Sequence, residues 1–477
     1  MGRRYDFPMN AAPPAIPQRE LRQRLKALLE QLEAGLIERG RVVRLAFLAA
    51  LAGEHTLLVG PPGTAKSELA RRLHLAFAGA RYFERLLTRF TVPEELFGPL
   101  SISALEQDRY ERITTGFLPQ ATIAFIDEVF KANSAILNAL LTLLNEREFD
   151  NGAGRERCPL VSVIGATNEV PADEVAEAFF DRFLMRLPVG PVSASGFRSL
   201  LQLDGEPLPA AADALTEADL AALHTAAARV SLPDEVAGLL AELRQMLAGE
   251  QVYVSDRRWV KVAWLLKVAA ASEGRTAVAT WDLWLLPWCV APTPERQAAV
   301  DAWLTARLGL EAGMAPPLLT RVVEAFEAQA ALEQEAEDLD YDESGRLRFS
   351  ADLDASVNDA KGASQAVRMS YRRRRRYGAL HIGARVGQVD ELIARIAGYA
   401  EAIAASRADL AAYTSQGLWI DREFAACADA NLAATTEAIE ALRLRAVAAR
   451  HAFTTLPRRE VDTGTVPEPV SVSAMPL

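Results

Sequence analysis

The segment that most constrains the fold reads LLVGPPGTAKS, from Leu57 to Ser67. Its apolar start is typical of a buried strand, the glycines and prolines that follow exclude regular structure, and the next residues, SELARRLHLAF, have helical spacing. A loop between a strand and a helix N-terminus gathers unpaired backbone N–H groups, and the helix dipole adds to their attraction for anions. The segment therefore predicts a phosphate-binding loop in an α/β protein.

This loop matches the pattern G-x-x-x-x-G-K-[ST] except that Ala65 replaces the second glycine. We expect that departure to cost little, because alanine adds one methyl group at a close backbone approach. A surface Lys-Ser after a Gly/Pro turn is the alternative that this segment alone leaves open. The pattern predicts a bound nucleotide with Mg²⁺, held by Gly60, Pro61, Pro62, Gly63, Thr64, Ala65, Lys66 and Ser67, with Lys66 on the β- and γ-phosphates and Ser67 on the metal.

A second strand pattern, IAFIDE, ends in the carboxylates of Asp127 and Glu128. Carboxylates at the end of a buried strand are costly unless a cation or water meets them, and ligands bind at the carboxyl ends of parallel strands. We expect Asp127 to hold Mg²⁺ through its water shell and Glu128 to orient and polarise the attacking water. The alternative is a helix N-terminus, where the dipole favours acids.

Two further polar residues follow apolar segments. Asn168 ends the strand pattern VSVIGATN, where it can hydrogen-bond the γ-phosphate and the attacking water, although an Asx turn is the alternative. Arg182, in FFDRF, is a candidate arginine finger that stabilises the transition state at a neighbour's nucleotide. Its alternative is an ion pair with Asp181 or a plain surface charge.

Composition narrows the class of protein. The chain has 477 residues, of which 50% are hydrophobic and 24% charged, as in globular proteins of several domains. Its net charge of -11 disfavours nonspecific binding to nucleic acid, and its 3 cysteines show no metal-site spacing. The start of the chain lacks the apolar stretch of a secretory signal, and no run reaches 18 apolar residues. We therefore expect a cytoplasmic protein with no membrane span.

Changes in composition along the chain predict its domains. We expect a doubly covered parallel sheet that binds the nucleotide, then a small helical domain, then a mainly helical, coiled-coil-like region. The first domain carries an insertion at about 94–117 and a hairpin at about 149–160. The expected boundaries are a flexible arm at 1–17, the nucleotide-binding core at 18–190, the helical lid at 195–312, the helical C-terminal domain at 316–456 and a disordered tail at 457–477.

With these elements in order, the first 300 or so residues resemble the MoxR family of AAA+ ATPases, most closely its RavA branch. The segments that carry the resemblance are GPPGTAKS (Walker A), TRFTVPEELFGPLSI, IAFIDE (Walker B), LLTLLNERE, GATNE (sensor 1), FFDRF (arginine finger) and SDRRW (sensor 2, Arg257). Arg257 would lie over phosphates, on its own nucleotide or a neighbour's, and a solvated arginine at a helix start is the alternative. The RavA branch also inserts a β-containing module in its C-terminal part, for which the sequence shows no clear counterpart.

The resemblance implies an ATPase that uses ATP and Mg²⁺ and assembles into hexameric rings. It implies a chaperone-like motor that remodels a protein substrate, paired with a protein that carries a von Willebrand factor A (vWA) domain. One alternative is a nucleic-acid-stimulated motor that uses the basic run Arg372–Arg376, although a solvated basic face is favoured in an acidic chain. Another is a nucleotide-gated scaffold, in which ATP fixes assembly and turnover is incidental.

Overall fold

The computed structural model describes residues 18–152, 154–168, 174–202, 213–335, 338–339, 349–350, 370–371, 373–374, 377–458 and 466–470. The chain divides into two compact units. The first comprises residues 1–308 with 412–425, and the second comprises residues 309–411 with 426–477. The arm predicted at 1–17 lies outside the described residues, and the predicted tail is described only at 457–458 and 466–470.

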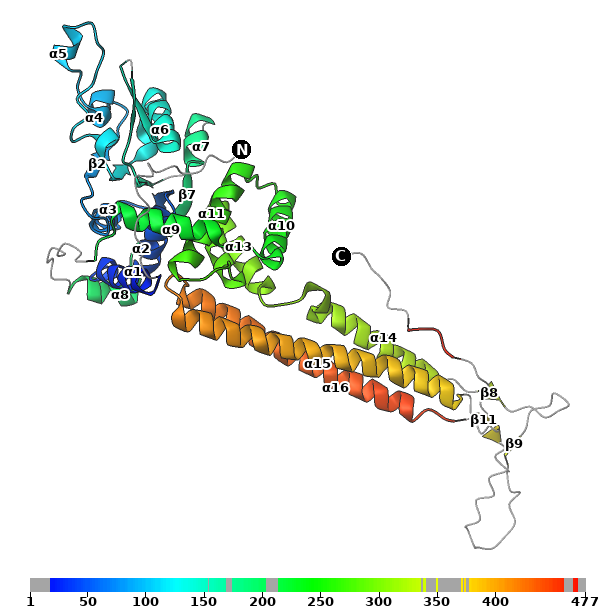
Figure 1. Cartoon of the computed structure of the whole chain (residues 1–477). Coiled ribbons are helices and arrows are strands. Elements are labelled where there is room, and N and C mark those ends of the chain that lie inside the picture. Colours follow the sequence, from blue (N-terminus) through cyan, green and yellow to red (C-terminus); the bar gives the residue numbers. More distant parts are fainter. Residues whose placement is uncertain are drawn as a thin grey trace, which may run out of the picture. The chain divides into compact units, whose positions relative to one another are not determined.

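The first unit is built on a five-stranded parallel sheet with the strand order β2-β3-β6-β1-β7, whose edge strands β2 and β7 are labelled in Figure 1. All six residues of the central strand β6 are buried, as expected where helices cover both faces of a parallel sheet. Because the strands are parallel, the segments that follow β1, β3 and β6 leave from the same edge. The strands are β1 (His55–Val59), β2 (Tyr82–Leu86), β3 (Ile123–Asp127), β6 (Ser162–Thr167) and β7 (Phe183–Pro188).

Helices precede and connect the strands. The apolar side of α2 is buried from Val42 to Leu51, and α2 packs against β1 and β7, while α3 packs against β3. Asn133 caps α6 by accepting a hydrogen bond from the Ile136 N–H. The helices of this part are α1 (Gln18–Glu33), α2 (Gly40–Leu51), α3 (Lys66–Leu75), α4 (Pro93–Phe97), α5 (Ile102–Leu105), α6 (Ser134–Glu146), α7 (Glu174–Phe180) and α8 (Ala194–Leu200).

An exposed hairpin joins the inserted segment that contains α4 and α5. Its strands β4 (Glu148–Asn151) and β5 (Gly154–Arg157) pair antiparallel, where the sequence predicted a hairpin. The Asn151 side chain accepts from the backbone N–H of Arg112 at 2.6 Å and donates to its carbonyl at 3.2 Å. The insertion and the hairpin are therefore held together as one surface element.

A helical lid follows the sheet and packs against it through α11. The Lys261 ammonium lies 2.5 Å from the buried Glu54 carboxylate, just before β1, and Trp264 donates to the Ala52 carbonyl at 3.0 Å. These contacts hold α11 at the amino ends of the strands. The lid helices are α9 (Glu217–Arg229), α10 (Asp234–Gly249), α11 (Asp256–Ser272), α12 (Leu286–Val290) and α13 (Pro294–Arg307).

Three long helices make up most of the second unit, so the predicted helical C-terminal region is confirmed: α14 (Pro316–Glu335), α15 (Ala379–Gln416) and α16 (Arg422–Thr454). Ion pairs join them, as at Arg445 with Glu327 (2.7 Å) and Arg385 with Glu333 (2.8 Å). Arg385 also donates to the carbonyl of Glu468 at 2.7 Å, so part of the predicted tail is held by a hydrogen bond.

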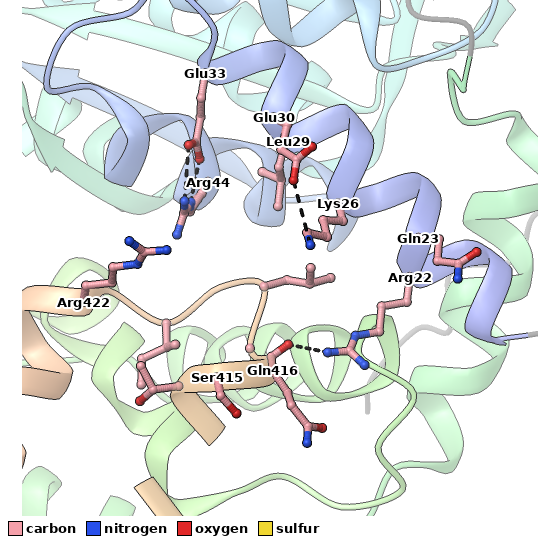
Figure 2. A pocket seen from close by; sticks show the side chains of 14 residues that line it. Arg22, Gln23, Lys26, Leu29, Glu30, Glu33, Arg44, Ser415, Gln416 and Arg422 are labelled. Atoms are coloured by element: carbon pink, nitrogen blue, oxygen red, sulfur yellow. Dashed lines mark hydrogen bonds and ion pairs between the residues drawn. The ribbon is translucent and has the colours of Figure 1, made fainter. Parts of the chain in front are cut away.

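The turn between α15 and α16 belongs to the first unit. Trp419 is buried there and donates to the Ser272 hydroxyl at the end of α11, at 2.8 Å. Beside it, α1 and the turn enclose a cavity of about 620 Å³. Basic side chains surround this cavity, and Arg44 pairs with Glu33 across 2.5 Å (Figure 2). No residue predicted to bind the nucleotide lines it.

Short strands lie between α14 and α15. Strand β8 (Asp338–Leu339) pairs antiparallel with β11 (Arg373–Arg374), and β9 (Phe349–Ser350) pairs with β10 (Ser370–Tyr371). Two residues of the basic run thus have backbone partners in a sheet, whereas Arg372, Arg375 and Arg376 lie outside the described residues. Among the helices that the structure describes, none has both the length and the apolar character needed to cross a membrane.

Buried His55 makes the stability of the core depend on pH. Its Nε2–H donates to the Leu144 carbonyl at 3.1 Å and its Nδ1 accepts from the Val163 N–H at 3.0 Å. Burial, and to a lesser extent Arg147, lowers its pKa well below the ordinary value of 6.5. Below that pH the unfolded chain binds a proton that the folded chain does not, so the free energy of unfolding falls as the pH drops.

The His55 contribution reaches about 1.4 kcal/mol per pH unit below the unfolded pKa. We expect His55→Gln, which does not titrate, to flatten the loss of stability between neutral and mildly acidic pH. Denaturant unfolding of both chains across that range measures the difference. Equal pH slopes for the wild type and the variant would show that His55 is protonated in the fold.

Candidate nucleotide-binding site

The loop from Gly60 to Ala65 joins β1 to α3 at the carboxyl edge of the sheet. A Cβ atom on Gly60 would lie 2.1 Å from the Val189 carbonyl oxygen, so only glycine fits there. Ala65 has φ 64°, in the left-handed region. The sequence predicted that alanine at this position costs only the steric effect of one methyl group. That prediction was incomplete, because Ala65 also holds a strained backbone conformation.

Lys66 begins α3, and its ammonium group folds back over the loop. Its Nζ donates to the carbonyls of Gly60 at 2.5 Å and Pro61 at 3.1 Å, and lies 3.4 Å from the Asn168 amide oxygen. Burial lowers its pKa, and the charges of Asp127 and Glu128 oppose that shift. The sheet thus brings together a lysine, two acids and an amide from three separate segments, as the sequence predicted.

Asn168 links the lysine to the acids. Its Nδ2 donates to Glu128 Oε1 at 2.7 Å, while Glu128 Oε2 lies 3.3 Å from the Lys131 ammonium. The backbone N–H of Glu128 donates to Asp127 Oδ1 at 2.9 Å, and Glu128 itself has φ 49°. A non-glycine residue held in this conformation beside other functional groups is typical of a functional site.

This donor set fits a magnesium nucleotide rather than a metal held by protein alone. In the described residues no group of three or more His, Cys, Asp or Glu side chains could hold a metal ion. Mg²⁺ needs only one or two protein ligands when phosphates and water supply the others. Asp127, at the end of β3, and Ser67, the second residue of α3, are the oxygen donors at this edge. The Lys66 ammonium, which now binds carbonyls of its own loop, is the matching cation for phosphate oxygens.

A turn before α2 borders the loop, and the sequence analysis did not identify it. Arg39 is buried and donates to the Gly190 carbonyl at 2.7 Å and the Thr64 carbonyl at 3.3 Å. Its neighbour Glu38 has φ 56° and accepts hydrogen bonds from the Ser193 hydroxyl and, at 2.7 Å, from the Ser193 N–H, and these bonds lower the pKa of Glu38. The only sequence signal was a glycine after two charged residues, which is too common to indicate a site.

Arg182 lies at the opposite edge of the sheet from Lys66. It immediately precedes β7, whose first residue, Phe183, pairs with His55 at the start of β1. The five residues of β1 separate that edge from the phosphate-binding loop by about 16 Å. The Arg182 guanidinium lies 3.5 Å from the Asp181 carboxylate, which is the ion pair considered as its alternative role.

Arg257 lies beside Arg182 rather than beside the loop of its own chain. Burial is the main cause that lowers the pKa of Arg182, and the charge of Arg257 lowers it further. The Arg257 Nη2 donates to the Asn145 side-chain oxygen at 2.6 Å, near the end of α6. The next residue, Arg258, is buried and donates to the carbonyls of Phe183 at 2.7 Å and Leu184 at 2.8 Å. Arg258 therefore fixes the start of α11, while Arg257 stays exposed next to Arg182.

The strain at Ala65 gives a testable effect on stability. We expect Ala65→Gly to raise the free energy of unfolding by about 1 kcal/mol, because glycine adopts a positive φ without steric cost. The control is Ala70→Gly in the middle of α3, which we expect to lower it by about 1 kcal/mol. Denaturant unfolding measures both, and a loss of stability in Ala65→Gly comparable to the control would refute the strain.

Comparison with known proteins gives two adjacent family matches. Residues 23–225 match the model described as the MoxR domain in the MoxR-vWA-beta-propeller ternary systems, and residues 235–304 match the AAA lid domain. An uncharacterised protein of Methanocaldococcus jannaschii is 42% identical over 269 residues, which are 56% of this chain and 70% of that relative.

Two further similarities are more distant. Protein MoxR of Paracoccus denitrificans is 29% identical over 180 residues, which are 36% of this chain and 52% of that relative. The crystal structure of a candidate ATPase from Cytophaga hutchinsonii aligns with a TM-score of 0.48 and 17% identity, over 59% of this chain and 91% of that chain. The MoxR domain and the AAA lid domain match adjacent parts of the chain in that order, and the chain covers 70% of a relative with which it is 42% identical. The chain therefore belongs to the MoxR family of AAA+ ATPases.

Proposed function

We propose that this protein hydrolyses ATP with Mg²⁺ at the carboxyl edge of its sheet. The contact that supports this most directly is the chain of hydrogen bonds from Lys66 through Asn168 to Glu128. Lys66 binds the β- and γ-phosphates in place of the loop carbonyls it now contacts, and Asp127 and Ser67 hold the metal. Bound Mg²⁺ neutralises charge on the phosphates. Glu128 accepts a proton from the attacking water, and Asn168 keeps its carboxylate in place.

The nucleotide base has a candidate site in the turn at 36–41. Arg39 joins this turn to the phosphate-binding loop, and Glu38 joins it to Ser193 at the start of α8. We propose that the base lies between this turn and the Val189–Ser193 segment. The turn contacts the loop at Thr64, and Val189 lies directly against Gly60, where an added Cβ atom would come within 2.1 Å of the Val189 carbonyl oxygen.

We propose further that Arg182 and Arg257 act on the nucleotide of a neighbouring subunit. Arg182 lies at the amino edge of the sheet, about 16 Å from the loop of its own chain, and Arg257 lies beside it. An arginine supplied from a neighbour stabilises the charge of the transition state and makes hydrolysis depend on assembly. Each nucleotide site would then be completed across a head-to-tail interface, and such interfaces close into rings, of which a hexamer is the predicted form.

A protein partner is the proposed target of the ring. The family model that matches this chain is named for systems with a vWA protein and a β-propeller, which we propose as its partner classes. The joined insertion and hairpin carry exposed apolar side chains suited to contact with protein, among them Ile102 (76% exposed) and Tyr110 (57%). Chaperone-like remodelling, action in the cytoplasm and membership of the RavA branch stay proposals on the strength of the sequence resemblance.

The role of Glu128 is tested by Glu128→Gln. The amide keeps the size and the hydrogen bond to Asn168 but cannot take up a proton, so we expect turnover to fall by at least about a hundredfold. Nucleotide binding and assembly should persist, as measured with a fluorescent ATP analogue and by light scattering. Wild-type turnover in the variant would remove Glu128 from the chemistry.

The shared site is tested by Arg182→Ala, with Arg443→Ala on the exposed face of α16 as control. Light scattering with and without ATP gives the mass, and phosphate release gives the rate. We expect wild type and both variants to reach about six subunits with ATP, while only Arg182→Ala loses hydrolysis, by about a thousandfold. A wild type that stays monomeric and still hydrolyses ATP would rule out both the ring and the finger.

A further inference from the structure

An exposed apolar patch lies next to Arg257. Tyr253 is 89% exposed and Val260 68% exposed, on either side of the start of α11. Tyr253 also lines a cavity of about 330 Å³ between the end of α10 and Trp259. Because four residues of chain span at most about 14 Å, Tyr253 lies within that distance of Arg257. Exposed apolar side chains that lie close together mark surfaces that another molecule covers.

A second apolar patch lies next to the proposed nucleotide site. Helix α8 starts directly after Ser193, which Glu38 holds against the turn before α2. Along this helix Phe197 is 53% exposed, Leu200 41% and Leu201 72%. Helices α8 and α10 lie on opposite sides of the first unit (Figure 1). The two patches therefore cannot cover each other within one chain.

We propose that the Tyr253 patch of one subunit docks on α8 of a second copy of this chain, beside the nucleotide that Arg182 and Arg257 complete. The inference rests on the proposed sharing of the site. If those arginines reach the phosphates of a neighbouring subunit, Tyr253 must lie close to the same nucleotide, because it lies near Arg257. Helix α8 of that neighbour borders the proposed nucleotide site and has exposed apolar side chains. Two different patches that meet in this way form a heterologous interface, the kind that builds rings. Tyrosine is also enriched among the residues that dominate binding energy at interfaces.

Cross-linking the full chain tests this docking. Of the 3 cysteines only Cys427 is exposed, so Cys427→Ser gives a background without accessible thiols. In that background, Tyr253→Cys with Leu201→Cys is treated with a flexible bismaleimide in the presence of ATP. We expect a ladder of covalent oligomers, a dimer when the two single variants are mixed, and no product from either single variant alone. The control pairs Tyr253→Cys with Leu444→Cys, which replaces another exposed leucine (58%, against 72% for Leu201) on α16.

Charges introduced into the two patches give an independent readout. Tyr253→Lys and Leu201→Glu should each raise the concentration needed for assembly by about tenfold, and the double variant should recover. If rings form but the Tyr253–Leu201 pair cross-links no better than the control, and the charge variants assemble normally, the docking is wrong while the shared site stands. If the wild type does not assemble with ATP, the shared site and the docking both fall.

Discussion

The parallel pairing of β1 with β6 on one side and with β7 on the other is the constraint on which the rest of the site depends. Together with the parallel pairing of β3 with β6, it places the phosphate-binding loop, the acids at the end of β3 and Asn168 at one edge, close enough to share hydrogen bonds. The same register places the start of β7, and with it Arg182, at the other edge. One strand length thus separates the candidate nucleotide-binding groups from Arg182, which is why we propose that each subunit contributes to two sites.

Helix α11 ties the second edge to the lid. Buried Arg258 donates to backbone carbonyls and Lys261 pairs with the buried Glu54, so the helix start is held firmly while Arg257 remains exposed beside Arg182. At its other end the Ser272 hydroxyl accepts from Trp419 in the turn between α15 and α16. A helix of 17 residues therefore connects the arginine edge with the turn between α15 and α16.

Much of the nucleotide edge could be predicted because its residues follow apolar strands in a short motif order. Lys66, Asp127, Glu128 and Asn168 lie together as expected, since strand ends meet at one edge of a parallel sheet. Spacing could not reveal the backbone strain at Ala65, which depends on φ, or the contact of Arg39 with the loop. Nor could it place Arg257, because the position of a lid helix is set by long-range packing such as the Lys261–Glu54 pair rather than by local pattern.

The measurement that tests the shared site most directly is complementation between two inactive chains. Glu128→Gln lacks the carboxylate proposed to act in catalysis but keeps Arg182 and Arg257, whereas Arg182→Ala keeps all the residues of the candidate nucleotide site. Each chain alone should be inactive. When equal amounts of the two chains assemble at random, a Glu128→Gln subunit donates its arginines to the nucleotide site of an Arg182→Ala subunit at about a quarter of the interfaces. Hydrolysis should return at those interfaces, because each then has both the Glu128 carboxylate and Arg182. A mixture that remains as inactive as its components, although both chains assemble together, would contradict the account.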